Sequence, residues 1–186
     1  MSQINVNTIA DSSGSNSITQ SSIGRFYTET DTDISGSAYK EWTNIPSWAD
    51  RIVVTVAGMN QTTNAIGGSL TLRVGNGGSI VSSGYVASSG YVKSGNAANA
   101  SYDTTGFWTY FWTTSNDRYG SYELFHMGSN KWICKGLFAS SASSGIAVNS
   151  TGYVGLSGVL DTIRVGSYNN TVTHTGSFVS IMYQGK

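Results

Sequence analysis

The chain has 186 residues, enough for one domain or for one domain with an arm. Its formal net charge is zero and only 11% of its residues are charged, which excludes the electrostatic footprint of a protein that binds nucleic acid or an anionic membrane. The single cysteine excludes an intrachain disulfide framework and a multi-cysteine zinc site. No apolar run is long enough for a membrane-spanning helix, and the opening residues lack the features of a secretory signal.

Residues 1–36 form a segment of their own. The run 11–17 is polar and has no periodicity, and the short alternating pieces around it can pair as strands but cannot bury a face alone. Such a segment is either a disordered tail or an arm that orders on a partner. We expect an extended attachment arm that makes contact through its apolar residues Ile4, Val6, Ile9 and Ile18.

A single domain is expected over residues 37–186. The clearest core strand is 51–57, which is rich in β-branched residues, and 69–74 alternate strictly between apolar and polar side chains. Residues 84–106 are rich in Gly, Ser, Asn and Tyr, and we expect a long exposed loop there. Further strand-like runs follow at 107–113, 122–127, 131–139, 146–148, 153–156, 159–165 and 178–183.

This spacing predicts the fold class. About eight to ten short strands at hairpin spacing, with no segment of helical period, are typical of an all-β domain. The scarcity of helix formers and the abundance of Ser, Thr, Val and Tyr agree with this. We therefore expect a single antiparallel β-sandwich or jelly-roll domain, preceded by the extended N-terminal arm.

The sequence gives little support for catalysis. A glycosidase needs two carboxylates about 5–10 Å apart; Asp103, Asp117 and Glu123 could meet in space, but no spacing places them together, and no nucleophile elbow is present. His126 and Cys134 flank an expected hairpin, yet two ligands do not make a zinc site. We expect no enzymatic activity, no catalytic residue, no metal and no cofactor.

Aromatic residues are the strongest candidates for binding. Alternation along 107–112, Phe-Trp-Thr-Tyr-Phe-Trp, places the tryptophans and the tyrosine on one face and the phenylalanines on the other. One face must be core, and the other is core, a subunit interface or a surface for stacking sugars. The tyrosines of 84–105 stand among small polar residues, as in many binding loops, although long Gly-rich loops are also tolerated insertions. The expected receptor or glycan surface comprises Tyr85, Tyr91, Tyr102, Trp108, Tyr110 and Trp112.

Several segments resemble phage proteins. Residues 4–15, Ile-Asn-Val-Asn-Thr-Ile-Ala-Asp-Ser-Ser-Gly-Ser, are similar to a short N-terminal motif of virion structural and fibre-like proteins of tailed phages, notably cyanophages. Residues 42–52, Trp-Thr-Asn-Ile-Pro-Ser-Trp-Ala-Asp-Arg-Ile, look like the opening of a phage β-domain. Residues 156–165 and 176–183 look like its closing strands. The resemblance spans most of residues 1–183, is patchy between 85 and 145, and carries no catalytic assignment.

The resemblance implies a virion structural protein, assembled in the host cytoplasm and exposed on the particle surface. The arm would dock onto another virion protein of the tail, neck or capsid, and the β-domain would project outward as a tail-fibre or adhesin-type host-binding protein. Capsid decoration or a head fibre is the alternative, and a free carbohydrate-binding lectin module is a further one. The expected partners also include further copies of the chain in a homotrimer, because fibres gain avidity from several copies, and a host-surface glycan.

Overall fold

Strand β5 (Ala49–Ala57) shows how local sequence builds this fold. Its side chains alternate: Ile52, Val54 and Val56 point into the core and are buried, while the residues between them point outward. β-Branched residues suit this pleated, half-buried environment, and the period of two gives the strand one core face. The core strand expected over 51–57 is therefore confirmed.

A computed structural model describes residues 8–10, 17–19, 25–61, 69–95, 98–111, 116–141, 145–168 and 172–185. The larger of its two main sheets has eight strands, in the spatial order β10 (Asn99–Asp103), β9 (Tyr85–Lys93), β14 (Ile146–Gly155), β13 (Lys131–Ser140), β12 (Arg118–His126), β5, β17 (Phe178–Gly185) and β3 (Arg25–Asp33). The second has five strands: β11 (Phe107–Thr109), β7 (Leu70–Asn76), β15 (Thr162–Ser167) and β4 (Tyr39–Thr43), with β8 (Ser79–Ile80) paired to β7. Two small pairs complete the strands, β6 (Asn60–Gln61) with β16 (His174–Thr175) and β1 (Thr8–Ala10) with β2 (Ser17–Thr19).

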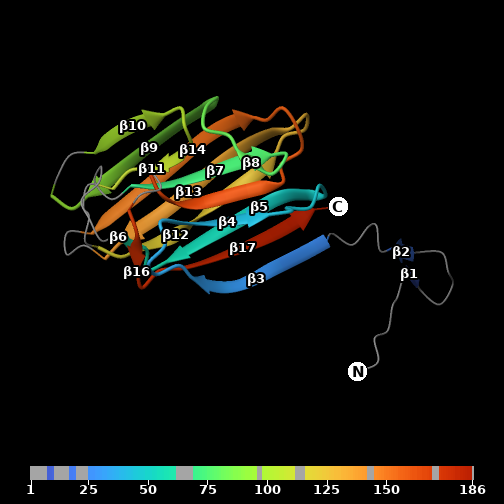
Figure 1. Cartoon of the computed structure of the whole chain (residues 1–186), viewed down its shortest axis with the longest axis horizontal. Coiled ribbons are helices and arrows are strands. Elements are labelled where there is room, and N and C mark those ends of the chain that lie inside the picture. The colour runs from blue at the N-terminus through green and yellow to red at the C-terminus, as the bar shows by residue number, and fades with distance from the viewer. Residues whose placement is uncertain are drawn as a thin grey trace, which may run out of the picture.

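The two main sheets pack against each other as a sandwich. Figure 1 shows the five-stranded sheet lying across the eight-stranded one. Leu72 and Val165 of the smaller sheet, like Leu124 of the larger, are buried in the shared core. The pairs between the named strands are antiparallel, so the predicted all-β antiparallel sandwich is confirmed.

Strand β3 lies inside the segment expected to be an attachment arm. It pairs with β17 from Arg25 to Asp33, and a bulge interrupts the register near the C-terminal end of β3, between Glu29 and Thr32. Residues 25–33 thus belong to the eight-stranded sheet, and the sandwich begins before the expected boundary at residue 37.

Part of the remaining arm also forms strands. β1 and β2 pair antiparallel, with Ile9 opposite Ile18. The two alternating pieces expected around these residues therefore pair with each other through their backbones. Ile4 and Val6 lie outside the described residues.

Residues 84–106, expected to form an exposed loop, contain a hairpin of two strands at one edge of the larger sheet. β9 pairs with β10 on one side and with β14 on the other. Tyr85, Ala87, Ser89 and Tyr91 of β9 are buried, whereas the residues between them are more exposed. The expected loop is therefore wrong. Two of the buried positions of β9 hold the small residues Ala87 and Ser89, so the sequence shows no alternation of large apolar and polar side chains there.

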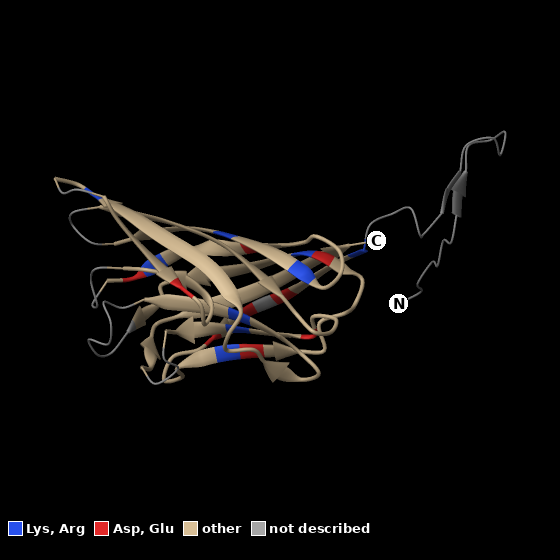
Figure 2. Ribbon diagram, turned by 90° about the horizontal axis from the view of Figure 1, so that it is seen from above, with Lys and Arg blue, Asp and Glu red and all other residues tan. Residues whose placement is uncertain are grey.

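Charged side chains are few and dispersed over the described residues. Figure 2 shows short blue and red segments scattered over both sheets rather than gathered in one region. Such a surface offers no strong field that would steer a charged partner. In the part of the chain that the structure describes, no helix has the length and apolar character needed to cross a bilayer.

Candidate functional site: the outer face of the larger sheet

The aromatic residues expected to form a receptor surface do not lie together at the surface. Tyr85, Tyr91 and Trp108 are buried. The Tyr85 hydroxyl accepts a hydrogen bond from Val74 N at 2.9 Å and donates one to Val74 O at 3.1 Å, and burial raises the pKa of Tyr85 to about 12. This side chain joins the two sheets and belongs to the core.

Trp108 and Tyr110 belong to an aromatic cluster beside strand β11. The Trp108 ring lies 5.1 Å from the Tyr110 ring and 5.3 Å from the Tyr168 ring, and Tyr110 lies 5.7 Å from Tyr91. Edge-to-face and tilted contacts of this kind are favourable beyond the area that they bury. Residues 107–111, the described part of the aromatic run, therefore build internal packing, with both phenylalanines in the core.

Tyr102 and Trp112 complete the expected set. Tyr102, on edge strand β10, is 77% exposed, and Trp112 lies outside the described residues. The described members are thus divided between the core, a partly buried cluster and one position on an edge strand, and they do not form one exposed surface.

The carboxylates considered for catalysis have separate structural partners. Asp103 accepts hydrogen bonds from the backbone N–H groups of the turn that follows β10. Asp117 accepts one from Asn60 Nδ2 at 3.1 Å, and Glu123 pairs with Arg51. Each carboxylate stabilises its own part of the fold, and no acid–base pair arises from them.

His126 and Cys134 share the β12–β13 hairpin without facing each other. His126 lies opposite Trp132 and stacks on its ring at 4.8 Å, while Cys134 lies opposite Leu124 in the core. Burial raises the pKa of the Cys134 thiol, which keeps it protonated and unreactive. Among the described residues, no group of three or more His, Cys, Asp or Glu could hold a metal ion.

The outer face of the larger sheet carries a set of exposed or partly exposed apolar side chains, here called the outer-face patch. Strand register places some of them directly opposite one another, in a row that crosses β9, β14, β13 and β12: Val86, Tyr153, Ile133 and Phe125. The patch also includes Phe26, Val92, Tyr102, Tyr119, Leu137 and Phe178. Apolar side chains exposed in this number on one face mark an interaction site in many proteins.

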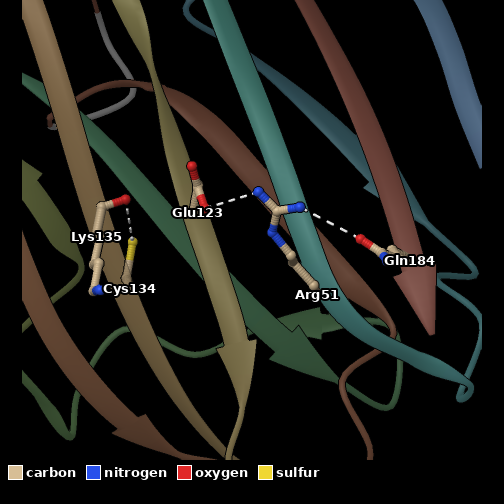
Figure 3. A network of polar contacts seen from close by, with 5 residues as sticks. All are labelled: Arg51, Glu123, Cys134, Lys135 and Gln184. Carbon is tan, nitrogen blue, oxygen red and sulfur yellow. Dashed lines mark hydrogen bonds and ion pairs between the residues drawn. The ribbon is translucent and has the colours of Figure 1, made fainter.

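Charged groups surround Phe125 toward one end of β12 on this face. Arg51 Nη2 lies 3.0 Å from Glu123 Oε2, and Arg51 Nη1 donates a hydrogen bond to Gln184 Oε1 at 3.4 Å (Figure 3). The Arg51 guanidinium and the Lys135 ammonium lie 5.9 Å and 5.6 Å from the centre of the Phe125 ring. Charges of both signs thus lie close together around an aromatic ring.

An open groove of about 430 Å³ lies beside Phe125. It is lined on three neighbouring strands by Ser121, Glu123, Phe125, Lys135, Gly136, Leu137, Asn149 and Ser150. Glu123 is the one carboxylate among these lining residues, and it is paired with Arg51. The groove lining thus lacks the pair of carboxylates that general acid–base hydrolysis of a glycoside uses.

Sequence reasoning missed this face. Its residues come from strands that are distant in the sequence, and only strand register brings them together. A signal was available in 131–139, where Ile133 and Leu137 stand at the positions that alternate with the core residues Trp132, Cys134 and Phe138. A strand with apolar residues on both sides has a covered or partner-binding second face.

Comparison with protein-family models, with curated proteins and with solved structures finds no match for the chain.

Proposed function

We propose that this chain is a structural protein of a tailed-phage virion, displayed on the particle surface as a homotrimer. In this proposal the outer-face patch forms the contacts between copies of the chain. Residues 1–24, which precede β3, attach the sandwich to another virion protein. The attachment arm is therefore shorter than the sequence alone predicts.

The observation that carries this proposal is the outer-face patch. Large apolar side chains gathered on one exposed face mark interaction sites in many proteins, and Leu137 is 64% exposed on this face, between Ser121 and Asn149 of the neighbouring strands. The charges beside it have both signs, since Arg51 pairs with Glu123. A second copy would meet no repulsive field of a single sign there, which favours association of identical chains.

Sequence features support the virion setting. The segments 4–15 and 42–52 resemble virion structural and fibre-like proteins of tailed phages. The second of these segments enters β5, whose residues form part of the core. A low content of charged residues and a fold made of hydrogen-bonded strands suit a protein that is exposed on a particle.

We favour a tail-fibre or adhesin position over capsid decoration or a head fibre. Several copies held side by side raise the avidity of weak host contacts, which is the advantage a fibre tip requires. A decorating protein would use the same sandwich but attach its arm to the capsid. A free lectin would need neither the arm nor the trimer.

Sedimentation analysis of the full chain tests the trimer. We expect a trimer for the native chain and a folded monomer for Leu137→Glu, because the new carboxylate would be desolvated in the contact between copies. Val159→Glu is the matched control, since Val159 is 53% exposed in the loop before β15, outside the outer-face patch, and this variant remains trimeric. A native chain that sediments as a monomer, or a Leu137→Glu chain that remains a trimer, contradicts the proposed contact.

A further inference from the structure

A cleft lined by aromatic rings lies between the edge strands of the two sheets. β3 ends the eight-stranded sheet and β4 ends the five-stranded sheet, while residues 44–48 connect β4 to β5. The cleft measures about 290 Å³. Its rings are Tyr27, Trp42, Trp48 and Tyr183, and its polar side chains include Glu29 and Asn44. We call it the aromatic cleft.

The rings form a wall that is open on one side. Tyr27 and Tyr183 lie opposite each other on β3 and β17 and stack with centroids 5.0 Å apart and planes 7° apart. Trp48 meets Tyr183 edge-on at 6.5 Å. Tyr183 and Trp42 are buried, whereas Tyr27 is 46% exposed and Trp48 is partly exposed. The last two rings therefore present surface to a ligand.

Backbone packing fixes the position of Trp48. The Trp48 carbonyl oxygen lies so close to Gly185 that a Cβ there would be 1.7 Å away, so the contact requires glycine. Ala49 N donates to Pro46 O at 3.0 Å, and Asn44 takes the left-handed conformation with φ 59°, which asparagine tolerates. The loop is thus held in place before any ligand arrives, as in most small-molecule sites.

Charges around the aromatic cleft indicate which ligands it accepts. Lys40 Nζ lies 3.5 Å from Glu29 Oε1 and 5.7 Å from the centre of the Trp42 ring, and Arg25 lies 5.7 Å from that of Trp48. A cationic ligand such as a quaternary ammonium would meet these two positive groups over the same rings. The Glu29 charge is balanced by Lys40, so a ligand needs no charge of its own.

We propose that the aromatic cleft binds a neutral pyranose residue of a glycan. The C–H face of the sugar packs on the exposed rings of Tyr27 and Trp48, and its hydroxyl groups bond with the Glu29 carboxylate and the Asn44 amide. This inference rests on the proposed function only for its biological setting, because it gives the displayed sandwich a receptor-binding site. The site differs from the outer-face patch, since alternation turns Phe26 to that patch and Tyr27 to the aromatic cleft.

Binding of defined saccharides to the full chain tests this inference. The probes are tetrasaccharides of glucose, mannose, galactose and N-acetylglucosamine, with choline as the cationic comparison, measured by saturation-transfer NMR and calorimetry. We expect at least one tetrasaccharide to bind, and Tyr27→Ala to weaken it about tenfold or more. Tyr27→Phe keeps the ring and retains binding, and Tyr39→Ala, which removes an exposed tyrosine that does not line the aromatic cleft, leaves binding unchanged.

Several results would overturn the inference: a native chain that binds none of the tetrasaccharides, choline binding in their place, or saccharide binding that survives Tyr27→Ala. These results are independent of the trimer and of the virion. Saccharide binding by a chain that is absent from particles would refute the proposed function alone, and a particle protein that binds no saccharide would refute the inference alone.

Discussion

Thr109 Oγ1 donates a hydrogen bond to the Tyr122 hydroxyl at 2.5 Å and so joins β11 of the smaller sheet to β12 of the larger. Both residues are fully buried. Burial raises the pKa of Tyr122 far above its ordinary value of about 10. The sandwich is thus joined internally by polar groups that must stay protonated, and its stability depends on pH for that reason.

We predict loss of stability in alkaline solution. In the unfolded chain tyrosines release their protons near pH 10, whereas burial raises the pKa of both Tyr85 and Tyr183 to about 12 and that of Tyr122 further. Stability is fully present below pH 10 and is lost as the pH rises toward the folded-state values. Arg118, whose pKa burial lowers to about 10, and Arg73, whose pKa burial also lowers, act in the opposite direction. The Cys134 thiol, whose pKa burial raises, acts in the same direction as the three tyrosines. Urea unfolding followed by circular dichroism at increasing pH measures this, and a midpoint that does not fall above pH 10 contradicts it.

Tyr122→Phe tests the bond between the sheets directly. The variant leaves the buried Thr109 hydroxyl without this partner, and we expect a loss of about 1–3 kcal/mol in the free energy of unfolding. The variant also removes a buried hydroxyl whose pKa burial raises. The free energy of unfolding therefore falls less steeply with rising pH than in the native chain. Tyr119→Phe on the exposed side of the same strand serves as the control. Equal stabilities of the native chain and Tyr122→Phe would show that the bond contributes nothing.

Val54→Asp is expected to unfold the sandwich. Val54 is fully buried on β5, between β12 and β17, where an unpaired carboxylate costs several kcal/mol. Thr55→Asp, at the next position on the outward side, stays folded because its carboxylate reaches solvent. Thermal melts of both variants decide the matter. A Val54→Asp chain with native thermal stability would place β5 outside the core.

Truncation separates the attachment arm from the sandwich. A chain that begins at Arg25 keeps β3 and is expected to fold with native stability while failing to join its assembly. A chain that begins at residue 37 lacks β3, exposes the edge of β17 and loses the Tyr27–Tyr183 stack, so its melting temperature is lower. Melts and incorporation assays of both truncations measure the two effects. Normal incorporation of the chain that begins at Arg25 would refute the role of the arm.

Local periodicity in the sequence predicts much of this fold. Residues 51–57 are rich in β-branched side chains and residues 69–74 alternate strictly, which identifies β5 and β7. The antiparallel sandwich follows from the number and spacing of such strands. Periodicity does not predict strand β9, because the polar residue Ser89 occupies one of its core positions. Its hydroxyl accepts a hydrogen bond from Tyr110 N at 3.0 Å. A buried polar residue with a partner in another strand has no local signature.

The candidate sites are harder to predict for a different reason. The aromatic cleft combines Tyr27, Trp48 and Tyr183 from three separate parts of the chain, and the outer-face patch combines strands that only the register aligns. The sequence does identify aromatic residues as important. It does not indicate which rings face solvent, because burial depends on contacts between strands that are far apart along the chain.

Labelling of intact particles with an antibody against the sandwich, viewed by electron microscopy, tests the central claim most directly. The particles are those purified from the culture in which the chain is produced. Our account predicts label on the particle surface, concentrated at the tail, whereas label spread over the head would support the capsid-decoration alternative. Particles that carry no label would contradict the account.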